Sequence, residues 1–276
     1  MPALSPVDLT LLALAASLVG LSKTALPGAA TLTVAVFAAV LPAKQSTGAL
    51  LVLLILGDLF AVWTYHAHAD WKTLRRMVPA VLVGVLVGTG FLATAGDAMV
   101  RRVIGVILLV LVAVTLLRRA AATRTAKRSG LGTLDAGEGS DAHVLAPPAS
   151  PATSGRGWRR RLETGTYGLL AGFTTMVANS GGPVMSMYFL ATRYSINRFL
   201  GTAAWFFFVV NLTKTPFSIS LGLISLDSLK LDLLLAPAVV VGAIIGRRLA
   251  KRIDQVLFDR LVLALTVVSA SYLLLQ

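Results

Sequence analysis

Residues 79–88 read Pro-Ala-Val-Leu-Val-Gly-Val-Leu-Val-Gly, and no charged residue occurs between Met77 and Ala95. A stretch of this length is close to the ~20 residues that cross the hydrocarbon core of a bilayer as a helix. Residues 24–43 and 164–192 are uncharged stretches of the same kind. Their apolar residues are largely consecutive, whereas strands of a membrane β-barrel alternate apolar and polar residues. The sequence therefore predicts an all-α polytopic membrane protein.

The composition excludes several other classes of protein. Of the 276 residues, 56% are hydrophobic and 13% are charged, whereas a soluble domain carries about 25% charged residues. The absence of cysteine excludes disulfides, zinc-thiolate sites, iron–sulfur clusters and thiol nucleophiles. The net charge of +13 would suggest nucleic acid in a soluble protein. In a membrane protein it reflects basic residues at the cytoplasmic ends of helices, so the lipid bilayer is the expected partner and nucleic acid is not.

The apolar sequence contains an internal repeat. Residues 237–246 read Pro-Ala-Val-Val-Val-Gly-Ala-Ile-Ile-Gly and match residues 79–88 at six of ten positions, including the proline and both glycines. With small gaps, Asp58 aligns with Asn211. Self-similarity of this kind predicts a duplicated architecture.

A polar segment separates the two copies. Residues 119–161 are rich in Ala, Gly, Ser and Pro and carry eight basic residues against three acidic ones. Such a composition, without an apolar stripe, is typical of a loosely ordered linker. The predicted organisation is a first transmembrane repeat at residues 1–118, a basic linker at 119–161 and a second transmembrane repeat at 162–276.

Each half begins with an interrupted apolar element. The interruptions are Ser-Lys-Thr-Ala-Leu-Pro-Gly at residues 22–28 and Asn-Ser-Gly-Gly-Pro at residues 179–183. Proline removes a backbone hydrogen bond, and a membrane tolerates this only where protein or water supplies a partner. We therefore expect a broken, re-entrant-like hairpin of two short helices near mid-membrane in each half, followed by three transmembrane helices.

The basic residues set the expected orientation. If the second hairpin returns to its starting side, Arg193, Arg198 and the basic cluster at residues 247–252 share the face of the linker. The positive-inside rule places this face in the cytoplasm. Each half then crosses the membrane an odd number of times, which makes the two repeats inverted and puts both chain termini on the outer face.

Glycines recur at a spacing that favours helix packing. Gly84 and Gly88 are four residues apart, and so are Gly242 and Gly246 in the second half. Small residues at this spacing let two membrane helices approach closely. We expect these glycines to lie at helix contacts within the bundle.

A few polar residues interrupt the apolar spans, chiefly Lys23, Asp58, Asn179, Asn211 and Lys214. An ionisable side chain at the bilayer centre costs about 2.5–3.5 kcal/mol on insertion scales, so it is treated as functional by default. The structural alternatives are a lysine that snorkels to the interface and a lysine that pairs permanently with Asp58.

The second interruption predicts an anion site. A proline suits the first turn of a new helix, and the free N–H groups of a helix N-terminus bind anions. The alternative is a kink without a ligand. The predicted anion contacts are Lys23, Thr24, Gly28, Asn179, Ser180, Gly181, Gly182, Asn211 and Lys214.

Asp58 is the predicted coupling residue. It is the only carboxylate within residues 47–65, and its counterpart Asn211 is uncharged, so a proton-linked role would be asymmetric between the halves. No metal or other cofactor is expected, because His66 and His68 have only Asp70 nearby as a third ligand.

The order of these features resembles the TauE/SafE family of sulfite and organosulfonate exporters. The resemblance rests on residues 20–28, on residues 179–183, and on Asn-Arg-Phe-Leu-Gly-Thr at 197–202 followed by Asn211 and Lys214. The first interruption departs from the glycine-rich form of the second. The resemblance implies a transporter of the bacterial-type inner membrane for small sulfur-containing anions.

The resulting hypothesis is a secondary transporter, and an exporter, that moves a small anion by alternating access. No nucleotide-binding motif is present, which argues against direct ATP drive. The alternatives are an anion channel or a membrane scaffold subunit. An intramembrane enzyme is disfavoured, since the spans contain neither a histidine dyad nor paired carboxylates. The expected partners are a small anionic substrate and the bilayer, with a homo-oligomer left open.

Overall fold

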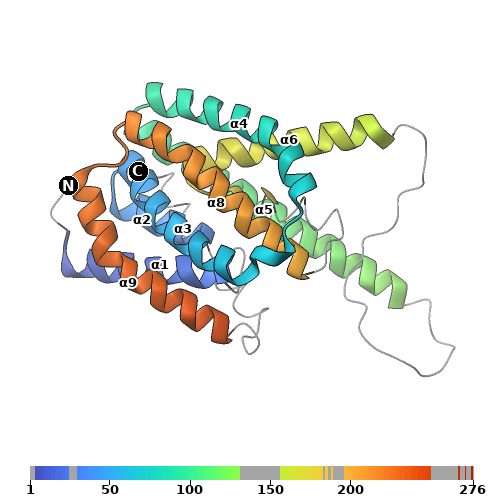
Figure 1. The fold of residues 1–276 in the computed structure, drawn as a ribbon, viewed down its shortest axis with the longest axis horizontal. Helices are drawn as coiled ribbons and strands as arrows, with labels where there is room; N and C mark the ends of the chain where they lie inside the picture. The colour runs from blue at the N-terminus through green and yellow to red at the C-terminus, as the bar shows by residue number, and fades with distance from the viewer. Residues whose placement is uncertain are drawn as a thin grey trace.

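A computed structural model describes residues 4–24, 30–130, 156–182, 184–185, 188 and 196–249, together with residues 267, 271 and 275. In this part of the chain the regular structure is entirely helical, which confirms the predicted fold class (Figure 1). The elements are α1 (Pro6–Thr24), α2 (Ala30–Val40), α3 (Ala43–Tyr65), the 3-10 turn η1 (His66–His68), α4 (Trp71–Thr94), α5 (Asp97–Gly130), α6 (Arg156–Ala178), α8 (Ile196–Ser220) and α9 (Leu226–Leu249).

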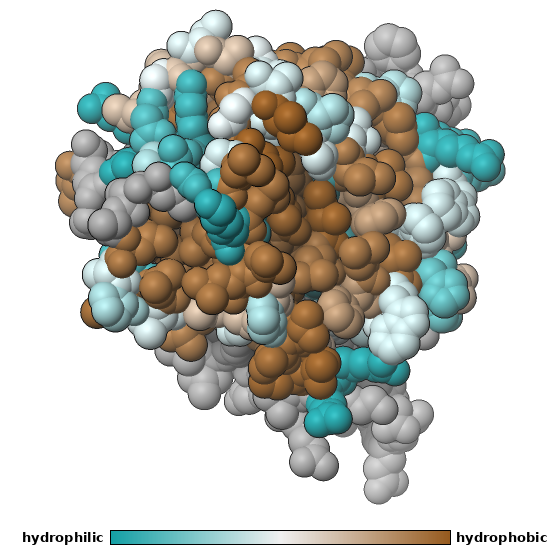
Figure 2. All heavy atoms as spheres, turned by 60° about the vertical axis from the view of Figure 1, so that its left-hand side comes forward, coloured by the Kyte–Doolittle hydropathy of each residue, from teal (hydrophilic) through white to brown (hydrophobic). Residues whose placement is uncertain are grey.

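The outer surface of the bundle is apolar. Figure 2 shows a broad hydrophobic surface, with hydrophilic residues gathered toward its edges. Single leucines on this surface are strongly exposed, such as Leu14 at 64% and Leu233 at 76%. Large exposed apolar surfaces mark contact with a membrane or with another protein. Among the described residues, the helical segments long and apolar enough to cross a bilayer are Pro6–Thr24, Ala43–His68, Trp71–Thr94, Asp97–Leu117 and Leu226–Arg248.

Both predicted interruptions coincide with helix ends. α1 ends at Thr24 and α2 begins at Ala30, while α6 ends at Ala178. α1 has 19 residues, enough for one crossing, and is therefore longer than the short helix that the interruption predicts. α2 has only 11 residues, about 16 Å of helix. The hydroxyl of Tyr65 donates to the Thr24 carbonyl (2.9 Å), so α1 ends near the end of α3, and α2 leads back to the start of α3.

Helices also extend into the segment that the composition assigns to a linker. α5 continues to Gly130 and α6 begins at Arg156. Alanine, arginine and lysine, which are frequent in residues 118–128, are strong helix formers and need no apolar stripe to continue an existing helix. Residues 131–155 lie outside the described part, and the division into two repeats and a linker stays a prediction.

The paired glycines lie at helix contacts, as predicted. Gly84 of α4 lies against the backbone of α6 at Leu169 and Phe173, where any side chain would collide. Gly242 of α9 lies in the same way against the backbone of α1 at Ser17. α4 of the first half therefore packs on α6 of the second, and α9 of the second half packs on α1 of the first.

α3 and α8 pack against each other in opposite directions. Gly48 near the start of α3 contacts the carbonyl of Leu223, just beyond the end of α8. Gly201 near the start of α8 contacts the backbone of Tyr65 at the end of α3. These reciprocal contacts bring the aligned positions of the two halves together (Figure 1).

α8 is shorter than the apolar run at residues 199–226 suggests. The helix ends at Ser220, and Gly222 has a φ of 67° before α9 begins at Leu226. Glycine adopts this left-handed conformation without the steric cost that other residues incur. No charged residue follows Lys214 in this run, so Gly222 is the sequence signal for the turn.

Side chains fix the two ends of the bundle. The Asp97 carboxylate at the start of α5 accepts from the backbone N–H groups of Ala43 (3.1 Å) and Lys44 (3.0 Å), and so caps α3. At the other end of α3, Asp70 caps α4 and forms an ion pair with Arg198 of α8 at 2.8 Å. The second contact joins the two halves of the chain.

Candidate functional site

Polar side chains from α1, α3, α8 and the region of α6 form one connected group inside the bundle. The exposed fraction is 0% for Asp58 and Lys214 and 1% for Asn211. Ionisable residues within membrane helices mark substrate or ion pathways. We call this group the buried polar cluster; its members are Lys23, Asp58, Thr175, Asn179, Asn211 and Lys214.

Lys23 and Asp58 form the ion pair of the cluster. The Lys23 Nζ lies 2.6 Å from Asp58 Oδ1, and the lysine side chain is 12% exposed. The same ammonium group lies 4.6 Å from the centre of the Phe207 ring, within the range of a cation–π contact. The lysine that pairs with the buried carboxylate is therefore Lys23, in the last turn of α1, and not Lys214.

Asn211 connects this ion pair to the second lysine. Its amide nitrogen donates to Asp58 Oδ2 at 2.6 Å. Its amide oxygen accepts from Lys214 Nζ at 3.4 Å. The two aligned positions of the halves, Asp58 and Asn211, are thus in direct contact across α3 and α8.

Lys214 binds neutral oxygen atoms. Its Nζ donates to the carbonyl of Thr175 and to the side-chain oxygen of Asn179, both at 2.6 Å. With the longer contacts to the Asn211 amide oxygen (3.4 Å) and the Thr175 hydroxyl (3.5 Å), four oxygens surround the three donors of the ammonium group. The buried polar cluster therefore contains two lysines and one carboxylate, and leaves one positive charge without a carboxylate when both lysines are protonated.

The interruption after α6 orients Asn179 toward Lys214. Asn179 has a φ of 49°, a left-handed conformation that asparagine tolerates better than most residues. Its amide nitrogen donates to the carbonyl of Thr47 at 2.9 Å, so its oxygen is left to accept from Lys214. The turn and the contact with α3 together fix the side chain.

The two interruptions contact α3 at different levels. The end of α1 meets α3 at Asp58 and Tyr65, whereas Asn179 meets it at Thr47. Thr47 and Asp58 are about 16 Å apart along the helix axis, at 1.5 Å per residue. The described ends of the two interruptions therefore lie at different heights along α3, and the buried polar cluster spans the distance between them; a common anion site between the interruptions stays a prediction.

The remaining predicted contacts have local roles or lie outside the described residues. The hydroxyl of Thr24 donates to the carbonyls of Gly20 (3.0 Å) and Ala243 (3.2 Å), and that of Ser180 donates to the carbonyl of Ala178 (3.0 Å). Gly181 packs against Thr175, and Gly182 has open space where a side chain would be. Gly28 belongs to the part of the chain that is not described.

Sequence reasoning missed two residues of interest. Thr175 lies four residues before Asn179, and this helical spacing was the available signal that both face the same neighbour. Asp232 of α9 is a second buried carboxylate, 3% exposed, and neither of its oxygens has a hydrogen-bond partner. It lies close in sequence to the exposed pair of Lys230 and Asp227 near the start of α9, so its position in the sequence does not indicate burial.

An all-helical, multi-pass membrane protein with a buried ionic cluster at its centre has the organisation of a membrane transporter. The model of the family described as sulfite exporter TauE/SafE matches residues 12–273, and the chain belongs to this family. The resemblance predicted from the sequence is confirmed. No curated protein and no solved structure matches the chain.

Proposed function

We propose that the chain is a secondary transporter that exports a small sulfur-containing anion, such as sulfite or an organosulfonate, across the cell membrane. The proposal rests on one observation: Asp58, the one carboxylate of the buried polar cluster, pairs with Lys23, and the partners of Lys214 are all uncharged. A bound anion would supply the missing negative charge in a low-dielectric interior, where an unpaired charge is costly. The description of the family supports export of a sulfur compound.

Lys214 is the proposed primary anion contact. Its present partners are a backbone carbonyl, a hydroxyl and two amide oxygens, which are weaker acceptors than an anionic oxygen. An incoming anion would displace the Asn179 oxygen from Lys214 and take its place. If Asn179 also gave up its hydrogen bond to the Thr47 carbonyl, its amide N–H would turn toward the anion as a second donor.

Complete burial of Lys214 supports transport by alternating access. With none of its surface exposed, the amino group can meet an anion only after helices around it separate on one side. Helices of the two halves pack on one another in three pairs: α3 with α8, α1 with α9, and α4 with α6. This arrangement is compatible with alternating access, in which the two halves of a transporter rock about a central site. Basic residues at one end of the bundle favour the cytoplasmic orientation of that end.

The test is anion binding by the purified protein. Sulfite, sulfate, thiosulfate, taurine, sulfoacetate and simple carboxylates would be compared by calorimetry in one buffer. We expect one class of sulfur anion to bind and Lys214→Met to weaken it roughly 10- to 100-fold, the value of a hydrogen bond to a charged group. Lys230→Met is the matched control, because Lys230 is exposed at the surface of α9.

A conservative variant separates binding from folding. Lys214→Arg keeps the charge, and we expect it to bind more tightly than Lys214→Met when both unfold at similar temperatures. If Lys214→Met and Lys230→Met bind every anion as the parent does, Lys214 is a structural residue and the proposed site is wrong. Failure of the parent to bind any of these anions would contradict the proposed substrate class.

A further inference from the structure

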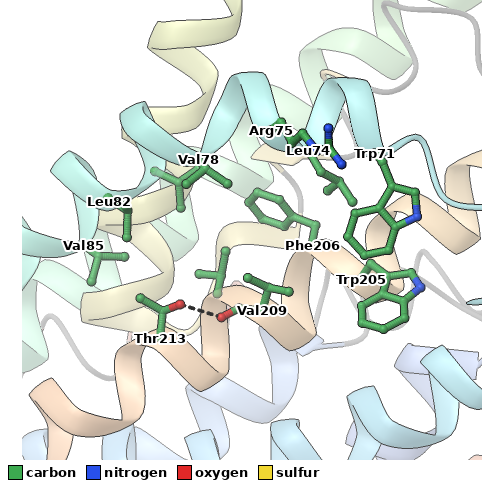
Figure 3. Close-up of a pocket in the computed structure, with 12 residues that line it drawn as sticks. Trp71, Leu74, Arg75, Val78, Leu82, Val85, Trp205, Phe206, Val209 and Thr213 are labelled. Carbon is green, nitrogen blue, oxygen red and sulfur yellow. Dashed lines mark hydrogen bonds between the residues drawn. The ribbon is translucent and has the colours of Figure 1, made fainter.

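A cavity of about 110 Å³ lies between α4 and α8, and no member of the buried polar cluster lines it. We call it the α4–α8 groove; it is lined by Trp71, Arg75, Leu82 and Val85 of α4 and by Trp205 and Val209 of α8, among others (Figure 3). None of the residues predicted to contact the transported anion lines it. A ligand other than the transported anion would therefore have to occupy this cavity.

The walls of the groove suit a hydrocarbon chain. Val78, Leu82 and Val209 line it and are 42%, 39% and 40% exposed, so the groove opens to the surroundings of the bundle. The lining hydroxyl of Thr213 donates to the Val209 carbonyl of its own helix at 2.8 Å, as Figure 3 shows. The deep end thus offers no free polar side chain, and an apolar occupant loses no hydrogen bond there.

The other end of the groove is cationic and aromatic. Arg75 is exposed and forms no ion pair with any described residue. The rings of Trp71 and Trp205 lie 5.0 Å apart, and their indole nitrogens are on the side away from Val85 (Figure 3). Trp71 is 47% exposed, and an exposed tryptophan beside basic residues at a helix end is typical of the membrane–water interface, whereas the Trp205 Nε1 is buried and has no hydrogen-bond partner. Arg75 therefore lies at the depth of lipid phosphates.

The length of the groove matches one leaflet. Arg75 and Val85 are about 15 Å apart along α4, at 1.5 Å per residue. Half of a hydrocarbon core of about 30 Å is the same distance. One acyl chain can therefore lie along the groove from the interface to the middle of the bilayer.

We infer that the α4–α8 groove is a binding site for an anionic phospholipid of the leaflet on the Trp71 side. The phosphate binds Arg75, and one acyl chain lies along Leu82 and Val209. The neighbouring exposed residues Lys72 and Arg76 raise the local positive potential and favour an anionic over a zwitterionic headgroup. This site is separate from the proposed anion site and does not depend on it.

The groove tryptophans provide the readout. The chain has four tryptophans, and the variant Trp63→Phe/Trp158→Phe keeps only Trp71 and Trp205. It would be reconstituted into phosphatidylcholine vesicles that contain increasing amounts of either dibrominated phosphatidylglycerol or dibrominated phosphatidylcholine, whose bromines quench tryptophan fluorescence. We expect half-maximal quenching at a roughly fivefold lower mole fraction of the anionic lipid, the effect of one arginine near the surface.

Two pairs of variants locate the effect. In this background, Arg75→Gln should abolish the preference for the anionic lipid, whereas Arg76→Gln, the same change on a residue that does not line the groove, should keep it. Val209→Phe fills the groove and should reduce quenching by both lipids. Leu212→Phe, on an exposed part of α8 that does not line the groove, should not.

Three results would overturn the inference. Equal quenching by the two brominated lipids would show that the headgroup is not recognised. Equal losses of preference in Arg75→Gln and Arg76→Gln would indicate general surface charge instead of a site. Absence of quenching by either lipid would mean that another occupant, such as a second copy of the chain, covers the groove.

Discussion

Asp58 and Asn211 occupy aligned positions of the two halves and are hydrogen-bonded to each other at 2.6 Å. Only the first carries a charge, and that charge faces Lys23 at 2.6 Å. An asymmetric pair where α3 meets α8 gives the first half of the chain a group that can bind a proton and gives the second half a neutral partner. At the residue scale, this asymmetry is the basis for expecting proton-linked transport.

Asp58→Asn tests this role. The variant preserves the shape of the side chain but cannot exchange a proton, and we expect it to bind the anion while its flux loses the pH dependence of the parent. The measurement is uptake into proteoliposomes across a series of external pH values. A folded variant whose flux keeps the parent's pH dependence would show that Asp58 carries no proton in the cycle.

The variant Asp58→Asn also removes one partner of a buried ion pair. This typically costs about 3–5 kcal/mol, because the remaining charge is left unpaired. Lys23→Met in the same chain removes that charge, so we expect the double variant to unfold at a higher temperature than Asp58→Asn alone. Thermal unfolding in one detergent, monitored by circular dichroism, separates a loss of stability from a loss of coupling.

The sequence predicts the members of the buried polar cluster better than their partners. Lys23, Asp58, Asn179, Asn211 and Lys214 are recognisable because polar groups are rare in membrane spans. Which lysine pairs with Asp58 depends on where α1 ends relative to α3, and no pattern in either helix encodes that. The Thr175 carbonyl that Lys214 binds is a backbone group, which residue types cannot reveal.

At the scale of the helices, close packing depends on glycine. Gly84 and Gly242 lie against the backbones of α6 and α1, where a side chain has no room. Both positions were predicted from spacing alone, because a small residue every fourth position leaves a flat stripe on a helix. The partner helices could not be predicted in this way, since the spacing is the same whichever helix lies opposite.

Two alanine variants of α4 should change stability in opposite directions. Gly84→Ala forces α4 away from α6 and should destabilise the protein by about 1–3 kcal/mol, as overpacking does. Gly90→Ala, at a position with no neighbouring atom within 4 Å, should be neutral or stabilising, because alanine is the better helix former. Chemical unfolding in mixed micelles measures both. Equal effects of the two changes would contradict the close contact of α4 with α6.

Helix boundaries were the least predictable feature. The sequence locates the interruptions after Thr24 and Ala178, because proline and glycine mark them. It does not show that α5 continues to Gly130, because a helix that continues through polar sequence is supported by propensity and not by an apolar stripe. The end of α8 at Ser220 is also hard to predict, because no charged residue occurs between Lys214 and Leu226.

At the scale of the whole molecule, the helix contacts between the two halves form matching pairs. α4 packs on α6 as α9 packs on α1, and α3 packs on α8 at the centre (Figure 1). A two-fold relation between inverted repeats would produce this pattern. The sequence repeat predicts that the halves are related, but the pairing of each helix with one of the other half follows only from the three-dimensional arrangement.

The orientation of the chain in the membrane can be predicted from its basic residues. We expect residue 139 to lie in the cytoplasm and both termini to lie outside, because basic residues collect on the cytoplasmic side. The chain has no cysteine, so Ser5→Cys, Gly139→Cys and Gln276→Cys each introduce one label site. An impermeant maleimide should react with the first and third in intact cells and with the second only after permeabilisation. Termini on opposite faces would contradict the inverted repeat.

Counterflow in proteoliposomes tests the central claim, which is that the chain carries a small sulfur anion through a site at Lys214. Vesicles loaded with unlabelled sulfite are diluted into a trace of radiolabelled sulfite, and internal label is followed over time. A carrier exchanges anions one at a time, so we predict transient accumulation of label above the external concentration, lost in Lys214→Met and kept in Lys230→Met. Absence of accumulation in the parent, or equal accumulation in Lys214→Met, would contradict the account.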